Sequence, residues 1–290
     1  MRYPLVQVKT EDRLVLDGML FEAASTVIVI NVHGTASNFY DEDFMRNMAA
    51  EFVTHNVSFL STNNRGTGVL QPSLPGCVGE IFEDCVKDID AWIGFAEAKG
   101  YRTIILQGHS LGTEKATYYA ARGNHAVHGL VLLAPSDSFG NQQRFMPAQV
   151  LLQLERESES LLERGKGDEL LTAHPRPHAG FAPKTAASYA SFFGKRAELA
   201  KALPFHAGKL PLYRKLRIPI LTVIGTKDIF TAIGVQAAAR LLRQNPHAEV
   251  RLIKGANHDF EGYEERLTNI VSAWLKTLAK RLMAHPNVNV

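Results

Sequence analysis

The sequence predicts an α/β fold in which helices flank a mostly parallel sheet and a helical cap is inserted after the middle of the chain. Three observations lead to this prediction. Short runs rich in β-branched residues alternate with helical patterns along most of the chain. The runs 26–32 and 130–133 are continuously apolar, which is typical of strands buried on both faces of a parallel sheet. The alternation stops between about 138 and 217 and then resumes.

The strand and helix candidates follow one another in order along the chain. Residues 5–21 alternate between apolar and polar side chains, so this segment is expected as an antiparallel edge. Strands that alternate with helices form βαβ units, which predicts a doubly wound sheet. The expected strands are 13–21, 26–32, 57–62, 103–108, 129–134, 219–225 and 248–253. The expected helices are 41–55, 79–99, 111–122, 231–244 and 261–282.

The interval 138–217 contains a long helix candidate at 145–164 and a segment rich in Pro and His at 173–178. A structureless loop of that length is improbable, so a helical cap is expected, inserted between core segments 1–137 and 218–290. Residues 140–217 hold 13 Lys and Arg against 7 Asp and Glu, a surplus of six positive charges. This surplus fits either a solvated outer surface or a lid that attracts anionic substrates.

Composition argues against several classes of protein. A net charge of +3 on 290 residues gives no concentrated basic face, so no nucleic-acid partner is expected. No apolar run reaches the roughly 18 residues that span a membrane, and the first residues lack the apolar core of a signal peptide. Cys77 and Cys85 are expected as free thiols in a reducing, cytoplasmic compartment. The sequence leaves the oligomeric state open.

No metal site is expected either. Two cysteines are too few for zinc, which normally takes four ligands. His174 and His178 are separated by prolines and cannot share one helical face. The chemistry described below also requires no cofactor.

Gly108-His109-Ser110-Leu111-Gly112 matches the pattern G-x-S-x-G. It follows the strand candidate 103–108 and opens the helix candidate 111–122. In that context the serine occupies a strained turn at the carboxyl edge of the sheet, and the flanking glycines remove Cβ atoms that would collide there. Ser110 is therefore the candidate nucleophile.

A serine hydroxyl is a weak nucleophile and needs a histidine base that a third group holds in place. Of the 11 histidines, only His258 stands in a turn between the last strand candidate and the last helix candidate. Asp228 follows the penultimate strand candidate and is the expected acid. Asp137, shortly after the preceding strand candidate, is the alternative, and Asp259 is expected to cap the last helix.

An oxyanion requires two donors that already point at it. The N–H groups of Leu111 and Thr35 are the candidates, because Gly34 allows the loop after strand 26–32 to turn tightly. His33 is expected to serve as a structural hydrogen-bonding residue. Aromatic residues such as Phe192 and Phe193 are candidates to line an acyl or aromatic pocket. The candidate substrate-binding residues are Gly34, His109, Tyr40 and Phe139.

These motifs resemble the α/β-hydrolase superfamily over nearly the whole chain. The resemblance rests on His33-Gly34, the loop Asn63-Asn64-Arg65-Gly66, the serine motif, Asp228 and His258. Asn64 departs from the usual Asp-x-Arg-Gly loop, which supports the scaffold more than the chemistry. A closer similarity is to the siderophore-esterase-like subgroup. It rests on His33-Gly34 with Asn38-Phe39-Tyr40, on the same 63–66 loop, and on Ser110-Leu111-Gly112 with Lys115 and Tyr118-Tyr119.

The resemblance implies an α/β-hydrolase fold and a serine esterase that cleaves a small-molecule carboxylic ester through an acyl-enzyme. The subgroup implies a siderophore-type ester, and an aromatic or acyl ester is the broader expectation. A thioesterase, an amidase, a C–C hydrolase or an acyltransferase could use the same three residues, because the motif fixes the nucleophile and not the leaving group. A ligand receptor that has lost turnover is the alternative from a different class.

Overall fold

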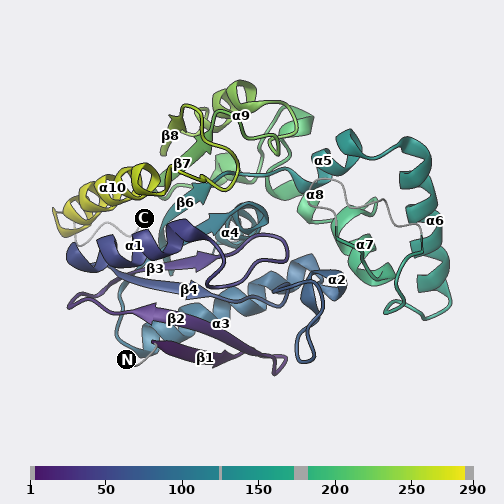
Figure 1. Ribbon diagram of the computed structural model, residues 1–290, viewed down its shortest axis with the longest axis horizontal. Coiled ribbons are helices and arrows are strands. Elements are labelled where there is room, and N and C mark those ends of the chain that lie inside the picture. Colours follow the sequence, from purple (N-terminus) through teal and green to yellow (C-terminus); the bar gives the residue numbers. More distant parts are fainter. Residues whose placement is uncertain (1–3, 124–125, 173–181, 285–290) are drawn as a thin grey trace.

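A computed structural model describes residues 4–123, 126–172 and 182–284 (Figure 1). Its centre is one eight-stranded sheet with the strand order β1-β2-β4-β3-β5-β6-β7-β8. Strands β1 and β2 are antiparallel to their neighbours and the other neighbouring pairs are parallel, which confirms the mostly parallel sheet with an antiparallel edge. The strands are β1 (Leu5–Lys9), β2 (Val15–Phe21), β3 (Val27–Val32), β4 (Ser58–Thr62), β5 (Thr103–His109), β6 (Val127–Leu133), β7 (Ile220–Gly225) and β8 (Ala248–Ile253).

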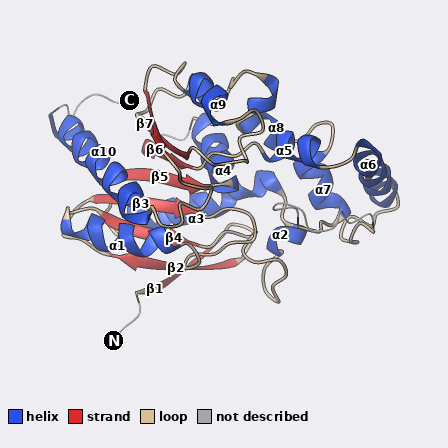
Figure 2. Cartoon of the chain, turned by 45° about the horizontal axis from the view of Figure 1, so that its top comes forward, coloured by secondary structure: helices blue, strands red, loops and turns tan. Residues whose placement is uncertain are grey.

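Helices cover both faces of this sheet (Figure 2). The central strand β3 shows the reason, because its successive side chains enter two different cores. Ile28 and Ile30 pack in a cluster with α3 (Cys85–Ala98), α4 (Leu111–Ala121) and α9 (Val235–Leu242). Val29 packs in a cluster with α1 (Asp43–Thr54) and α10 (Glu264–Ala284). A strand that is apolar on both faces therefore holds two helical layers together.

The helix expected at 79–99 is broken in the structure. It consists of a short helix α2 (Gly76–Gly79), the 3₁₀ turn η1 (Phe82–Asp84) and α3. Glu80 interrupts it with an extended backbone, at φ −61° and ψ 132°. Its carboxylate is buried against Lys115 and its carbonyl oxygen accepts a hydrogen bond from Ser188. These tertiary contacts override the helical pattern of the local sequence.

Two further helices begin later than expected. Helix α9 begins at Val235 instead of 231, because Ala232 and Gly234 have φ values of +58° and +83°. Helix α10 begins at Glu264 instead of 261, after Phe260 with φ +57°. Positive φ is incompatible with an α-helix, so these turns delay each start. Asp259 is thus five residues before the first residue of α10, and the expectation that it caps this helix is wrong.

Between β6 and β7 the alternation of strands and helices is interrupted by a series of helices. These helices extend to one side of the sheet (Figure 1). The helix expected at 145–164 is present as α6 (Ala148–Glu163), which begins after Pro147. A separate helix, α5 (Ser138–Phe145), precedes it, and the ring of Pro147 disfavours helical backbone at Met146 between the two. The other described elements are α7 (Ala186–Phe193), α8 (Leu199–Ala202) and the 3₁₀ turns η2 (Phe205–Ala207) and η3 (Tyr213–Lys215). The segment with His174 and His178 lies outside the described residues.

Helices α6 and α7 have a small hydrophobic cluster of their own, separate from those of the sheet. It includes Leu154 and Leu161 of α6 and Tyr189 of α7. Cys77 and Cys85 are buried and unpaired, as expected. In the described part of the chain, no helix combines the length and the apolar character that crossing a bilayer requires.

Candidate active site

Ser110 lies on the sharp turn between β5 and α4. Its backbone has φ +54° and ψ −125°, a strained conformation for a residue with a side chain. Both flanking glycines are required by close backbone approaches. A Cβ atom on Gly108 would lie 2.2 Å from the carbonyl oxygen of Gly112, and one on Gly112 would lie 2.1 Å from that of Val32. The sequence G-x-S-x-G therefore forms the tight turn that its pattern predicts.

His258 and Asp228 lie next to Ser110, each on its own loop. His258 follows β8, and its Nε2 atom is 2.8 Å from the Ser110 Oγ atom. The His258 Nδ1 atom is 2.9 Å from Oδ2 of Asp228, which follows β7. A carboxylate accepts, so Nδ1 carries the proton and Nε2 is free to accept the serine proton. The structure thus brings together the three residues that the sequence singled out.

Phe230 helps to hold this arrangement. Its backbone N–H donates to Oδ1 of Asp228 at 2.8 Å, which fixes the orientation of the carboxylate. Its ring lies 4.4 Å from the ring of His258, centre to centre. The sequence reasoning missed Phe230, although its place two residues after the candidate acid was a usable signal.

Asp137, the alternative acid, is engaged elsewhere. Its Oδ1 atom accepts from the backbone N–H of Gly140 at 2.7 Å and caps the start of α5. Its Oδ2 atom accepts from the backbone N–H of His206 at 2.7 Å and lies 2.7 Å from the Nδ1 atom of the same residue. The carboxylate therefore joins the beginning of α5 to the turn η2 and is not bonded to His258.

The loop after β3 lies against the serine, as expected for one wall of an oxyanion site. A Cβ atom on Gly34 would lie 2.9 Å from the Ser110 Cβ atom and 3.2 Å from the carbonyl oxygen of His109. Only glycine allows this approach. Thr35 and Leu111 both line the cavity beside Ser110.

His33 supports this loop from within the core. Its Nδ1–H donates to the carbonyl oxygen of Gly34 at 2.7 Å, and its Nε2 atom accepts from the backbone N–H of Asn64 at 3.2 Å. Burial lowers the pKa of His33 to about 3, so the ring is neutral at physiological pH. These bonds are those of a structural histidine.

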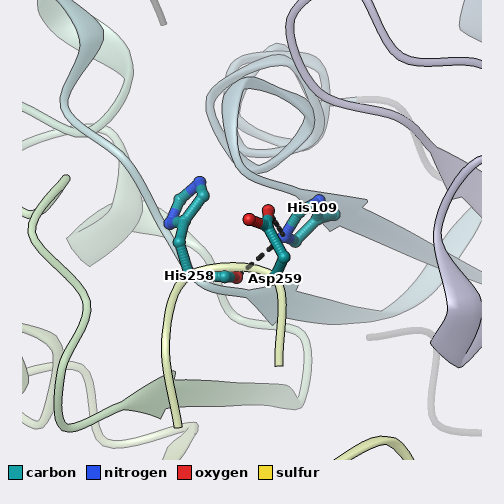
Figure 3. Close-up of side chains that lie close together, drawn as sticks. All are labelled: His109, His258 and Asp259. Atoms are coloured by element: carbon teal, nitrogen blue, oxygen red, sulfur yellow. Dashed lines mark hydrogen bonds and ion pairs between the residues drawn. The ribbon is translucent and has the colours of Figure 1, made fainter. Parts of the chain in front are cut away.

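His109 was expected to bind substrate, and the structure gives its ring a different setting (Figure 3). The ring is 2% exposed and packs against Phe44 and Phe260. Its Nε2–H donates to the backbone carbonyl oxygen of His258 at 3.1 Å. Burial lowers the pKa of His109, which favours a neutral ring. His109 lines the cavity, but the contacts of its ring are with protein groups.

His109, His258 and Asp259 form a group whose potential ligand atoms lie within 4.8 Å of one another (Figure 3). Three of the four ring nitrogens of this group already have hydrogen-bond partners. Both His258 nitrogens face Asp228 and Ser110, and Nε2 of His109 donates to a carbonyl oxygen. A metal ion bound to His258 would have to break its contact with Ser110 or its contact with Asp228.

A cavity of about 260 Å³ lies over Ser110. Its wall includes parts of the core, among them Phe230 and Glu80, and parts of the 138–217 interval, among them Lys184, Phe192 and Phe193. The two phenylalanines are aromatic candidates that the sequence named. Glu80, Lys184 and Cys77 also line the cavity and were not expected, because none of them belongs to a motif that the sequence analysis identified.

Two predicted substrate-binding residues are not brought to this cavity. Tyr40 is 62% exposed and its ring packs against Phe39. Phe139 lies against His206, with ring centres 5.5 Å apart. An aromatic residue near a motif in sequence can be turned away from it by the packing of its own loop or helix.

Comparisons with solved structures show the same fold in several esterases. A carboxyl esterase from Bacillus coagulans superposes with a TM-score of 0.70 at 15% identity and covers 96% of this chain and 99% of its own. Est1E from Butyrivibrio proteoclasticus gives a TM-score of 0.65 at 14% identity, over 96% of this chain and 99% of its own. The hydrolase GrgF from a Penicillium species gives a TM-score of 0.69 at 17% identity, over 98% of this chain and 100% of its own.

No curated protein matches the sequence. The model of the family described as the alpha/beta hydrolase fold matches residues 27–260, from the central strand β3 to the loop that carries His258. That span includes Ser110, Asp228 and most of the sheet. The chain belongs to the α/β-hydrolase fold family.

Proposed function

We propose that the protein is a serine hydrolase that cleaves carboxylic esters of small molecules through an acyl-enzyme. One observation carries the proposal. Ser110 Oγ lies 2.8 Å from His258 Nε2, and His258 Nδ1 lies 2.9 Å from Asp228 Oδ2, on a strained turn beneath a cavity. This is the geometry of a nucleophile, a base and an acid that holds the base.

In the first half of the reaction, Ser110 Oγ attacks the ester carbonyl carbon while His258 Nε2 takes the serine proton. The carbonyl oxygen becomes negative and is held by the N–H groups of Leu111 and Thr35. Asp228 stabilises the charged imidazole and keeps its tautomer. The intermediate then collapses, the bond to the alcohol oxygen breaks, and His258 returns its proton to the leaving alcohol.

In the second half, a water molecule attacks the acyl-serine ester. His258 removes a proton from the water, the carbonyl oxygen is again held by the two N–H groups, and the acid leaves as Ser110 regains its proton. No metal or cofactor enters these steps. We assign the cap role to the 138–217 interval, because Lys184, Phe192 and Phe193 line the cavity over the serine.

The substrate class follows from the cavity wall and from the similarity to known esterases. Phe192, Phe193 and Phe230 line the cavity, which supports an aromatic or acyl ester. One related structure is described as Est1E with ferulic acid bound, and ferulic acid is an aromatic acid. We include siderophore-type esters in this proposal because the sequence is similar to the siderophore-esterase-like subgroup. The buried, unpaired thiols support a reducing compartment such as the cytoplasm.

The test combines labelling with turnover. A fluorophosphonate probe is expected to label the wild-type protein and not Ser110→Ala, and a panel of phenyl, alkyl and siderophore esters is expected to show turnover. The panel includes thioesters, anilides and an acceptor alcohol, so a thioesterase, an amidase or an acyltransferase would be recognised by its faster reaction. Labelling of Ser110 without turnover of any substrate would favour the alternative that the protein is a ligand receptor. Absence of labelling would overturn the proposal.

A further inference from the structure

Among the described residues of the 138–217 interval, the positive charges are not gathered over the cavity. Nearly all of these Lys and Arg residues are exposed or half-buried on the outer surface. Lys195, for example, pairs at the surface with Glu155 and Glu159. Lys184 is the exception in the described part of this interval, because its side chain is buried and lines the cavity.

Lys184 has no counter-charge of its own. Its Nζ atom donates to the carbonyl oxygen of Cys77 at 2.8 Å and to Ser188 Oγ at 3.1 Å, and lies 3.7 Å from the centre of the Phe192 ring. These three partners are neutral groups. Among the described residues, no carboxylate forms an ion pair with Lys184, although the residue is only 9% exposed.

The buried carboxylate of Glu80, which lies close to Lys184, already has a positively charged partner. Glu80 lines the cavity close to Lys184, but its carboxylate is paired with Lys115, which also donates to Asn64. Both partners of that pair are at most 1% exposed. The three buried ionisable groups therefore leave one positive charge at the cavity wall. Burying an unpaired charge is costly, and a ligand that supplies the opposite charge removes that cost.

The other two acidic groups of the cavity wall, Glu42 and Asp259, are in a different cluster. Glu42 lies 3.6 Å from Nδ1 of His109, and Asp259 lies 4.0 Å from its Nε2 atom. An anionic substrate group would be repelled from these two carboxylates and attracted to Lys184. The cavity wall thus carries the positive charge of Lys184 and the two carboxylates near His109, together with Phe192, Phe193 and Phe230.

We propose that Lys184 binds a carboxylate of the substrate, and that the preferred substrates are esters that carry a free carboxylate besides the ester group. This inference rests on the ester-hydrolase function proposed above and names its substrate class. A lysine ammonium has three N–H donors, and two protein oxygens use two of them. The aromatic rings of Phe192 and Phe193 would contact the rest of the substrate.

The titration of Lys184 gives a test without any substitution. Burial lowers its pKa to about 8, with Glu80 and Cys77 acting to raise it and Lys115 acting to lower it further. The ammonium charge is therefore lost as pH rises through about 8. Preference for an anionic substrate over a neutral one should decline over the same range.

The experiment compares matched substrates in a pH-stat. Monoethyl adipate and ethyl hexanoate differ only by a carboxylate on the acid side, and 4-acetoxybutanoate and butyl acetate differ only by one on the alcohol side. Preference within the first pair places the carboxylate in the acyl group, and preference within the second places it in the leaving alcohol. Wild-type protein is expected to favour the anionic member of one pair by about tenfold or more in kcat/KM, as for a hydrogen bond to a charged group.

Three variants distinguish recognition from structure. Lys184→Met keeps the length of the side chain, and should lower the ratio of kcat/KM for the anionic ester to kcat/KM for the neutral ester to about one. Lys184→Arg keeps the charge and should retain a preference. Lys195→Met, at the surface of the same interval, should leave the preference unchanged. High salt should have little effect, because buried charges are screened less than exposed ones.

Equal activity toward both members of each pair would overturn the proposal, as would an equal loss for neutral and anionic esters in a folded Lys184→Met protein. If that variant does not fold, the wild-type pH dependence decides: a preference that stays constant from about pH 6.5 to about pH 9.5 contradicts the role of Lys184. If no ester is hydrolysed at all, the proposed function fails. Carboxylate binding is then measured separately by calorimetry. Monoethyl adipate and ethyl hexanoate are each titrated into the Ser110→Ala protein, and their dissociation constants are compared.

Discussion

The ring of His109 holds the backbone of His258: its Nε2–H donates to the His258 carbonyl oxygen over 3.1 Å. The residue before the candidate nucleophile is thus bonded to the loop that carries the candidate base. The rings of the two histidines lie 5.3 Å apart, centre to centre. His109 therefore fixes how far the His258 loop stands from the turn of Ser110.

This relationship predicts that His109 is a positioning residue. His109→Leu removes the N–H donor and leaves the His258 carbonyl oxygen unsatisfied in the core, so we expect kcat to fall by about tenfold or more while KM changes little. His109→Gln retains a donor and should restore part of kcat. The pH profile of kcat should also shift in His109→Leu, since the environment of His258 changes. A loss confined to thermal stability would show that His109 has a structural role only.

Ser110→Ala should abolish hydrolysis. The loss of kcat is expected to reach about 10⁴ or more, because the remaining groups can only bind and polarise the ester. The substitution removes one oxygen atom and keeps the backbone of the turn, so the melting temperature should not fall. A folded Ser110→Ala protein with wild-type turnover would exclude the proposed mechanism.

Asp228→Asn and Asp137→Asn should have different effects. In Asp228→Asn the imidazole loses the carboxylate that fixes its tautomer, and kcat should fall by about 10⁴. Asp137→Asn weakens the cap of α5 and the contact with His206, so the expected loss is about 1 kcal/mol of stability with kcat nearly unchanged. Both variants are compared by steady-state kinetics and thermal denaturation. A larger loss of kcat in the Asp137 variant would reverse the assignment.

Lys115 and Glu80 form an ion pair that is almost completely buried, at 0% and 1% exposure. Lys115→Met leaves the Glu80 carboxylate buried without its partner, and should cost about 3–5 kcal/mol in the free energy of unfolding. The double variant Lys115→Met with Glu80→Met removes both charges and should recover much of that loss. Denaturation by urea measures all three proteins. An equal loss in the single and the double variant would mean that the charge of Glu80 is not the cause.

The buried carboxyl group of Glu114 should make the free energy of unfolding depend on pH. Burial raises its pKa from 4.5 to about 8, and the nearby Asp137 raises it further, while Ser138 and Ser136 hydrogen-bond the carboxyl group. A carboxyl group whose pKa is raised by folding holds a proton that the unfolded chain has released. The free energy of unfolding therefore falls as pH rises from 4.5 to about 8.

Below pH 6.5 the titration of His33 makes the free energy of unfolding rise with pH, which is opposite to the effect of Glu114. The reason is that folding lowers the pKa of His33 to about 3, so the unfolded chain takes up a proton that the folded protein does not. The test is therefore made between about pH 7 and about pH 8, where most of the His33 ring is neutral in both states. Lys184, whose pKa folding lowers to about 8, opposes the decline as pH approaches 8, so the comparison is between wild type and Glu114→Gln at each pH. Wild-type stability should decline there by at most about 1 kcal/mol per pH unit, and Glu114→Gln should flatten this decline. The same slope in both proteins would show that Glu114 is not its source.

The sequence by itself determined the features that depend on local patterns. Continuous apolar runs such as 26–32 predicted the parallel strands, because a strand covered on both faces has no polar side to expose. The glycines around Ser110 predicted the tight turn, since no other residue allows the backbone approaches measured there. Chain order then selected Asp228 and His258, which are found beside the serine.

Only the tertiary structure decided what surrounds those three residues. Lys184 reaches the carbonyl oxygen of Cys77 across 107 positions of sequence, and Ser188 reaches that of Glu80 across 108. The second contact also breaks the helix that the pattern of 79–99 predicted. Tyr40 and Phe139 were expected in the pocket by proximity in sequence and are packed elsewhere. Long-range contacts of this kind depend on how whole layers pack together, and no local pattern of residues encodes them.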